Sequence, residues 1–471
     1  MTGGAWTTLV PHALIILGGL AIFLVIQAAG GALRAPGAPG GFRPVGAPEV
    51  GQVDLILHVT ATLAAVVAAG VLLSRLVGRV GQPAVIGEVA AGILLGPSLL
   101  GWVAPDLAHL LIPGPDVDPK GQVPAALKAI SELGVILYMF LVGLELDLDH
   151  LAERAQAALV ISNASIVAPF VLGAALALGL YPVFSHDGVP FTSFALFLGS
   201  AMAITAFPVL ARLLTDRGME KTDLGALALG CAALNDVTAW CLLALVVGFA
   251  QADLSTSVRV VAGAIAFIAL MLVGARPLVR NRVVRIEAES AALPQSVVSG
   301  IFLAILLSAL ATQIIGIHAV FGAFLFGALI PHESRVCREF TARLKDPVTV
   351  LLLPAFFTYT GLRTQIGLVS GWENWLWCLL ICVVATVGKF GGTFVAARYA
   401  GLAPRAAAAL GALMNTRGLM ELIVLNIGLD LGVISPTLFA MMVVMALVTT
   451  ALTVPALNSI SGTPSYADGH R

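Results

Sequence analysis

Long apolar runs separated by short polar loops follow one another along almost the whole chain. Most of these runs reach about 20 residues, the length that an α-helix rising 1.5 Å per residue needs to cross a bilayer. The runs after Ala84, Leu127 and Ile317 are shorter, as expected of helices that other helices shield. The pattern predicts an all-α polytopic membrane protein. The candidate spans begin near Val53, Ala84, Leu127, Gln156, Phe191, Leu224, Val258, Ser296, Ile317, Val348, Trp375, Arg405 and Pro436.

A further apolar run, Thr8 to Gly30, precedes these spans. It is long enough to cross a bilayer and lacks the basic segment that opens a secretory signal peptide, so we expect an extra N-terminal helix. The next residues, Ala32 to Pro48, are rich in Gly, Pro and Ala and predict a loop. We therefore divide the chain into an N-terminal helix and loop (1–50), a transmembrane domain (51–457) and a short tail (458–471).

Composition agrees with the hydrophobic pattern and narrows the function. Hydrophobic residues make up 59% of the chain and charged residues 11%, which excludes an ordinary soluble domain. The net charge of -1 argues against a nucleic-acid partner. We expect neither a cofactor nor enzymatic activity. The cysteines have no metal-binding spacing and are expected to pack in the interior. They are Cys231, Cys241, Cys337, Cys378 and Cys382.

Basic residues are unevenly divided between alternate loops. If the helix near Val53 runs into the cytoplasm, the loops on the opposite side hold only Arg34, Arg43, Lys120, Lys128 and Arg363. Because Lys and Arg concentrate in cytoplasmic loops, this orientation is favoured, and it places both termini inside a plasma or inner membrane. The cytoplasmic loops then hold Arg75, Arg79, Arg154, Arg212, Arg217, Lys221, Arg276, Arg280, Arg282, Arg285, Arg335, Arg338, Arg343, Lys345, Arg398 and Arg405.

Asn235 and Asp236 lie near the middle of the apolar segment 224–248. A carboxylate in hydrocarbon is costly because its charge must leave water, so such a residue is usually functional. The simpler alternative is a hydrogen bond between Asp236 and a neighbouring helix. Thr238 enlarges the polar cluster, and no charged residue nearby in the segment holds the carboxylate inert. We therefore predict an ion site at Asp236.

Two other apolar runs, 199–213 and 413–422, are interrupted by polar and helix-breaking residues. Paired broken helices in the two halves of a transporter indicate an inverted repeat with its site at the membrane midplane. The alternative for each run is an ordinary proline kink or a loop between two shorter helices. The interrupting residues are Ala206, Phe207 and Pro208 in the first run, and Asn415, Thr416, Arg417 and Gly418 in the second.

Three more charged residues lie inside apolar runs. Lys389 has about ten apolar positions on either side, too many for easy snorkelling to the membrane surface. It either balances a helix C-terminus, competes with a transported cation, or is a structural lysine that snorkels. Arg417 and Glu421 are four residues apart and could pair on one helix face, as a structural pair or as part of the site.

Several motifs carry a resemblance to a known family. In this order and combination the chain resembles the second monovalent cation:proton antiporter family, and within it the plant cation/proton exchangers and their bacterial relatives more than the Kef-type potassium systems. The resemblance covers nearly all of 53–457. The motifs are GQPAVIGEVAAGILLGPSLLG from Gly81, FLVGLELDLD from Phe140, AITAFPVLARLL from Ala203, GALALGCAALNDVTAW from Gly225, HAVFGAFLFGALIP from His318 and MNTRGLMELIVLNIGLDLGVIS from Met414.

The resemblance implies a thirteen-helix core with inverted repeats and two crossing broken helices. One part of the core would form a homodimer interface and the other a mobile ion-binding unit. By the same likeness Asp236 alternately holds a proton or a cation, with Asn235 as its partner. Lys389 would lie on the helix that faces the site, and Thr205 would help line it.

The resemblance and the buried carboxylate together predict exchange of K⁺ or Na⁺ for H⁺. A carboxylate in a low-dielectric cavity favours its protonated form, and one group that binds either ion enforces exchange by competition. Oxygen ligands from Asp236, Asn235 and Thr205 suit a hard monovalent cation. A single carboxylate indicates one-for-one, electroneutral exchange, although a titrating Lys389 could carry a second proton.

Two alternatives remain open. The first is a K⁺ channel or efflux pathway on the same scaffold, against which the absence of the filter sequence TVGYG counts. The second is an organic-anion symporter of a related fold, which would have no buried carboxylate at its centre. The chain differs from the Kef-type systems in one respect: residues 458–471 are too few to form a nucleotide-binding regulatory domain.

Overall fold

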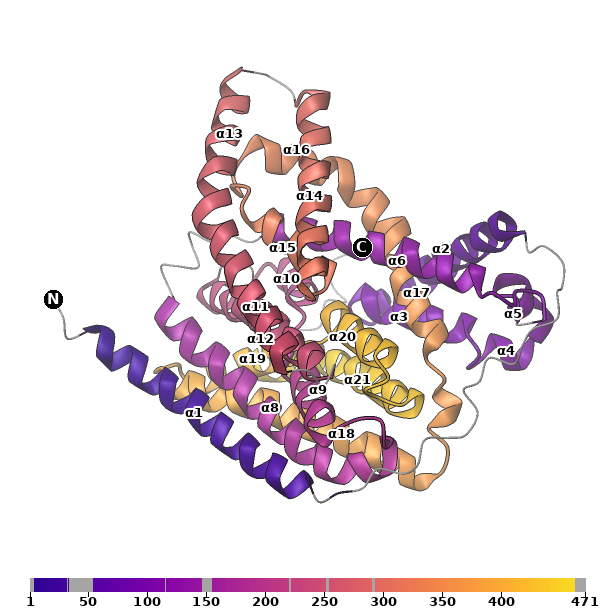
Figure 1. Cartoon of the computed structure of the whole chain (residues 1–471), viewed down its shortest axis with the longest axis horizontal. Coiled ribbons are helices and arrows are strands. Elements are labelled where there is room, and N and C mark those ends of the chain that lie inside the picture. Colours follow the sequence, from indigo (N-terminus) through magenta and orange to yellow (C-terminus); the bar gives the residue numbers. More distant parts are fainter. Residues whose placement is uncertain are drawn as a thin grey trace.

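The computed structural model describes residues 4–31, 33, 54–114, 116–145, 155–219, 222–250, 254–289 and 293–461. Its regular structure within these ranges is entirely helical, which confirms the predicted all-α fold (Figure 1). Most of the expected loop at Ala32 to Pro48 and the tail beyond Ser461 lie outside the described residues.

The helices follow one another along the chain in the order that the apolar runs predict. In the first half they are α1 (Gly4–Gly30), α2 (Leu55–Arg79), α3 (Ala84–Leu95), α4 (Leu100–Val103), α5 (Pro105–Leu111), α6 (Gln122–Glu145), α8 (Ala155–Phe184), α9 (Phe191–Ala203), α10 (Phe207–Asp216) and α11 (Asp223–Ala250). In the second half they are α12 (Leu254–Ala269), α13 (Arg276–Glu289), α14 (Gln295–Ile315), α15 (Ala319–Ala328), α16 (Arg335–Asp346), α17 (Leu353–Arg363), α18 (Trp372–Tyr399), α19 (Pro404–Met414), α20 (Leu419–Asp430) and α21 (Pro436–Ser461). Shorter helical turns are η1 (Leu270–Ala275), η2 (Pro347–Leu352) and η3 (Ile366–Leu368).

Among the described residues, 8 helices are long and apolar enough to cross a membrane, or 9 if the bent pair α19 and α20 counts as one span. Of the three short spans expected, the one after Ile317 is confirmed, since α15 has 10 residues. The run after Ala84 forms the 12-residue helix α3, which together with α4 makes one 20-residue span, Ala84–Val103. The third expectation is wrong, because α6 runs for 24 residues from Gln122. The Asp118 carboxylate accepts the backbone N–H groups of Gln122 and Val123, so the helix begins before the apolar run does.

The N-terminal helix α1 runs along α8 (Figure 1). A Cβ on Gly19 would lie 2.6 Å from a methyl carbon of Val167, so glycine permits the close approach of the two helices. Near the other end of α1, the Gln27 side-chain amide donates to the Thr192 hydroxyl at 3.0 Å. These contacts join the extra helix to α8 and to the start of α9.

Most of the remaining helices pack within two groups. The α6 group consists of α2, α3, α6, α14, α15 and α17, and the α8 group of α8, α9, α10, α11, α18, α19, α20 and α21. Within the α6 group, α6 and α15 cross so closely that a Cβ on Gly143 would lie 2.2 Å from the Phe324 carbonyl oxygen. Small residues at such crossings let membrane helices approach each other, and they make each group a firmly packed unit.

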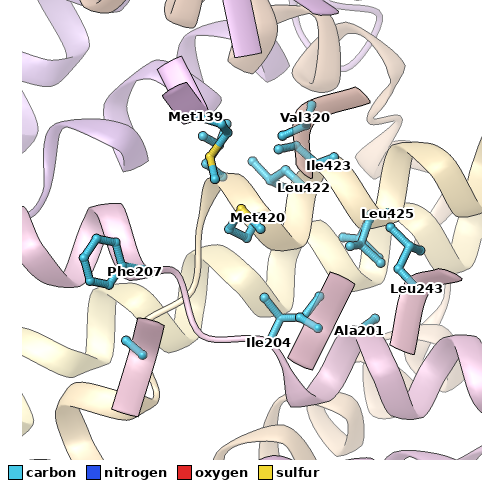
Figure 2. Packing of buried hydrophobic residues seen from close by; sticks show 14 of the residues in the cluster. Met139, Ala201, Ile204, Phe207, Leu243, Val320, Met420, Leu422, Ile423 and Leu425 are labelled. Carbon is cyan, nitrogen blue, oxygen red and sulfur yellow. The ribbon is translucent and has the colours of Figure 1, made fainter. Parts of the chain in front are cut away.

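Apolar side chains fill much of the boundary between the two groups. Met139 of α6 and Val320 of α15 belong to the same buried cluster as Leu422 and Ile423 of α20. Figure 2 shows Met139 and Val320 at the end of α20 that carries Leu422 and Ile423. These contacts are apolar and not directional.

Both predicted interruptions occur in the structure. The first leaves Ile204 to Ala206 unwound between α9 and α10, and the second leaves Asn415 to Gly418 unwound between α19 and α20, which are bent by 42°. Pro208 lies in the first turn of α10, where the missing N–H is not needed, so the break comes before the proline.

Candidate functional site

The two unwound segments cross and bond directly to each other. The backbone N–H of Ala206 donates to the Thr416 carbonyl at 3.0 Å. The Thr205 hydroxyl donates to the Met414 carbonyl at 3.0 Å. Figure 2 shows the extended chain of the first segment between Ile204 and Phe207. The crossing thus satisfies backbone groups that have no helical partner at the ends of α9, α10, α19 and α20.

Two buried cations cover the C-terminal end of α9. The Arg417 guanidinium donates to the carbonyls of Ala201 and Met202 at 3.0 and 2.7 Å, and the Lys389 ammonium donates to the carbonyl of Ala203. Both cations are 0% exposed. A helix C-terminus carries unpaired carbonyls and a partial negative charge, so these residues balance it where no water is available.

Glu421 balances the charge of Arg417 from the next helix. The ion pair joins Nη1 of Arg417 to Oε2 of Glu421 at 3.1 Å, and both residues are fully buried. Glu421 lies in the first turn of α20, where the helix dipole favours an anion. The Thr450 hydroxyl of α21 accepts the N–H of Arg417 and donates to its carbonyl, which fixes the backbone of the unwound segment.

Asn235 of α11 connects the first broken helix to α8. Its Oδ1 accepts from the Ser162 hydroxyl at 2.6 Å, and its Nδ2 donates to Ser165 at 3.0 Å and to Thr205 at 3.2 Å. Sequence reasoning missed both serines. Their spacing of three residues on an apolar helix was the available signal, because positions i and i+3 share a helix face.

Asp236 is 0% exposed, and neither of its carboxylate oxygens has a hydrogen-bond partner within the described part of the chain. An ionised carboxylate without a partner is very costly in such surroundings. The group therefore requires either a proton or a cation. The side-chain oxygen of Asn415, in the second unwound segment, is likewise buried without a hydrogen-bond partner among the described residues.

Lys389 lies beside this region, but its hydrogen bonds run elsewhere. Its Nζ donates to the carbonyl of Ser165 at 3.0 Å in addition to that of Ala203. The ammonium group thus bonds to one carbonyl inside α8 and one at the C-terminal end of α9, and no hydrogen bond joins it to Asp236.

The donor set around Asp236 does not resemble a transition-metal centre. The described residues contain no group of three or more His, Cys, Asp or Glu side chains that could hold a metal ion. Cys231, Cys337, Cys378 and Cys382 are free thiols, and the first three are buried. Asp236 therefore belongs to no such cluster within the described part of the chain.

Comparisons with known proteins agree with this architecture. The family model for the sodium/hydrogen exchanger transmembrane region matches residues 62–459. The Na⁺/H⁺ antiporter NhaS4 of Synechocystis is 41% identical over 415 residues, which cover 88% of this chain and 99% of that protein. Cation/H⁺ antiporter 20 of Arabidopsis thaliana is 38% identical over 80% of this chain. The K⁺/H⁺ antiporter 1 of Saccharomyces cerevisiae is 31% identical over 83% of this chain.

The matched region is nearly all of the Synechocystis protein but only 45% of the Arabidopsis and yeast proteins, so this chain spans about half the length of those two relatives. Among solved structures, the sodium proton antiporter MjNhaP1 of Methanocaldococcus jannaschii has a TM-score of 0.63 at 14% identity, covering 87% of this chain and 98% of that one. That likeness shows the fold. The chain therefore belongs to the sodium/hydrogen exchanger family, and its resemblance to the monovalent cation:proton antiporters is confirmed.

Proposed function

We propose that the protein exchanges a monovalent cation, K⁺ or Na⁺, for H⁺ across a plasma or inner membrane. The observation that carries this proposal is the buried carboxylate of Asp236, both of whose oxygens lack hydrogen-bond partners among the described residues. The names of the relatives, which are Na⁺/H⁺, cation/H⁺ and K⁺/H⁺ antiporters, support it.

Competition at Asp236 couples the two ions. The carboxylate binds a proton in one half of the cycle and a cation in the other, and either occupant removes the cost of an unpaired buried charge. Asn235 is held by Ser162, Ser165 and Thr205, so it presents a fixed amide dipole beside the site. The unwound chain at Thr205 and Asn415 supplies further oxygens for a dehydrated cation.

The exchange is one-for-one. Arg417 and Glu421 neutralise each other, and Lys389 donates to two carbonyl oxygens, which bond more strongly to a charged ammonium than to a neutral amine. These contacts support a stabilising role for the three charged residues at the crossing and on α8. Asp236 alone changes its occupant.

Access to the site alternates between the two sides through movement of the α8 group against the α6 group. A cavity of about 410 Å³ lies between the α2–α3 turn on one side and α10 and α21 on the other. It is lined by Arg79, Arg212 and Arg217, which the loop charges place on the cytoplasmic face. This arrangement supports an inward-open state, with both termini in the cytoplasm. We expect the working unit to be a homodimer.

Proteoliposomes that contain a pH-sensitive dye test the proposal. Pulses of KCl or NaCl are applied to the wild type and to Asp236→Asn, with the voltage held at zero by an ionophore. We expect at least one salt to move protons in the wild type and neither to do so in the variant. The active salt identifies the ion. Asp223→Asn, an exposed change on the same helix, is the matched control and keeps wild-type exchange.

Two results would contradict the proposal. Exchange that persists in Asp236→Asn would move the site elsewhere. Cation flux without proton movement in the wild type would instead identify a channel on the same scaffold.

A further inference from the structure

A compact group of charged side chains lies at the contact between the C-terminal end of α20, a helix of the α8 group, and the helices of the α6 group. The Asp430 carboxylate accepts from Lys128 of α6 at 2.8 Å through Oδ2, and from Arg363 of α17 at 2.6 Å through Oδ1. These partners are 302 and 67 residues away in sequence. A single anion on α20 therefore joins two helices of the other group.

Other groups orient the two cations. Arg363 also donates to Oδ1 of Asn426 at 3.1 Å, and Asn426 donates to the Thr360 hydroxyl at 2.8 Å. The Arg363 guanidinium lies over the Tyr359 ring, 5.5 Å from its centroid. Asn426 is one turn before Asp430, so two polar side chains of α20 bond to α17 along the same helix face.

The remaining charged neighbour belongs to the α6 group itself. Glu132 is 3.8 Å from Lys128 and one turn further along α6. His318 also lines the small cavity at this place. Asp430 is thus the only acidic side chain among the described residues lining this cavity that comes from the α8 group.

This cluster and the inner cavity lie at opposite ends of the boundary between the two groups. The cavity next to Asp430 measures about 40 Å³, against about 410 Å³ at the arginine-lined side. Lys128 and Arg363 lie on the side that the loop charges assign to the outside. The apolar packing of Met139 and Val320 with Leu422 and Ile423 also lies at this boundary, and Ile423 lines the cavity next to Asp430 (Figure 2).

We propose that Asp430 is a positioning residue of the exchange, which closes the outer side through Lys128 and Arg363 while the inner side is open. Apolar contacts between the groups can slide, whereas an ion pair with two fixed partners holds one register. The two bonds must break before the site opens outward. The inference rests on the alternating access of the proposed function and deepens it.

Chemical labelling from outside tests this inference without measuring transport. Ile427 lines the small outer cavity, and Ile427→Cys gives a thiol there for a membrane-impermeant maleimide. The labelling rate is measured with Asp430 intact, in Asp430→Asn and in Asp430→Glu. Loss of both pairs should raise the rate by up to about 25-fold, because each partly exposed ion pair shifts such an equilibrium by at most about fivefold. The Glu variant keeps the charge and stays near the slow rate.

Two further variants distinguish a closing contact from general loosening. Glu132→Gln removes a charge whose partner lies on its own helix, and it should leave the labelling rate unchanged. Arg363→Gln removes one of the two bonds to Asp430 and should raise the rate by part of the full effect. Arg363→Gln also serves as the test if Asp430→Asn does not fold, as judged by size-exclusion chromatography.

Equal labelling rates with Asp and Asn at position 430 would overturn the inference, as would an equal rise in Glu132→Gln. The labelling of the wild-type chain, which lacks Ile427→Cys, measures the reaction of the native cysteines and is subtracted. Failure of the proposed function would give a different result: the wild type would move no protons in proteoliposomes, while the labelling rates with Asp and Asn at position 430 would still differ. A lower apparent KM for external cation in Asp430→Asn is the expected companion result.

Discussion

Four charged residues of similar burial have different surroundings at the crossing of the broken helices. Arg417 and Glu421 pair with each other, and Lys389 bonds to carbonyl oxygens, whereas Asp236 has no hydrogen-bond partner among the described residues. Nε of Arg417 and Oε1 of Glu421 also lack hydrogen-bond partners among the described residues, but each of these two groups has an oppositely charged partner in the ion pair. Neither oxygen of Asp236 has any partner there, so a proton or a cation would remove the cost of its charge. This contrast supports the proposal that Asp236 is the residue that exchanges ions.

Competition at one carboxylate predicts a defined pH dependence. As the pH falls, a larger fraction of Asp236 side chains carries a proton, so more cation is needed to occupy the site. We expect the apparent KM for the cation to rise by up to about tenfold per pH unit, while the maximal rate changes less. Initial rates of dye response over a grid of pH and salt concentration measure both. A KM that does not change while the maximal rate falls would contradict competition.

Lys389 offers a second prediction at this scale. Lys389→Met removes the donor to the carbonyls of Ser165 and Ala203, and each buried acceptor left unpaired costs about 1–3 kcal/mol. We expect a lower melting temperature for the detergent-solubilised variant. The folded fraction should still exchange one cation per proton. A variant of unchanged stability that loses exchange would instead make Lys389 a proton carrier.

The two broken helices depend on each other as elements. Each unwound segment satisfies backbone groups of the other, so neither break is stable alone in a medium without water. Four helix ends meet here, and their partial charges are balanced by Arg417 and Lys389 at the end of α9 and by Glu421 at the start of α20. The geometry of this crossing sets the position of the site.

Close packing at the crossing predicts a sensitive glycine. A Cβ on Gly418 would lie 2.7 Å from a methyl carbon of Val209, so Gly418→Ala forces the two segments apart. We expect a loss of about 1–3 kcal/mol in stability and slower exchange. The double variant Gly418→Ala/Val209→Ala should recover part of both.

The control for this prediction is Gly391→Ala in the middle of α18. A Cβ there has no neighbour within 4 Å, and alanine favours a helix more than glycine does, so stability should not fall. Thermal unfolding in detergent and proteoliposome exchange are measured for all three variants. If Gly418→Ala behaves like Gly391→Ala, the crossing is not tightly constrained.

At the scale of the whole molecule, the boundary between the two helix groups differs at its two ends. The inner end holds the larger cavity, and the other end holds the charged cluster at Asp430. Two such ends and one central carboxylate are what the proposed exchange of one ion per movement requires.

One-for-one exchange predicts that transport moves no net charge. Solid-supported membranes loaded with proteoliposomes should show no sustained current during a salt pulse, while the pH dye responds. Membrane potential, about 2.3 kcal/mol per charge per 100 mV, would then not drive the cycle. A steady current that scales with the proton flux would show that a second charge moves, and Lys389 would be its first candidate.

The sequence alone determined the membrane class, the order of the helices, the two interruptions and the isolated carboxylate in an apolar run. These follow from local rules, because hydrocarbon tolerates only apolar helices and penalises every charge within them. Pro208 indicated the position of the first interruption less exactly, because the unwound residues come before it. The start of α6 was missed, because the Asp118 contacts that extend this helix lie outside the apolar run.

Only the tertiary structure decided which charges are satisfied. Ser162, Ser165 and Thr205 come to Asn235 from distant parts of the chain, and the carbonyl partners of Lys389 and Arg417 lie on α8 and α9. The joining of Asp430 to Lys128 and Arg363 likewise requires two helix groups to meet. Such contacts depend on the packing of helices far apart in sequence, and no local pattern of residues encodes a partner at that distance.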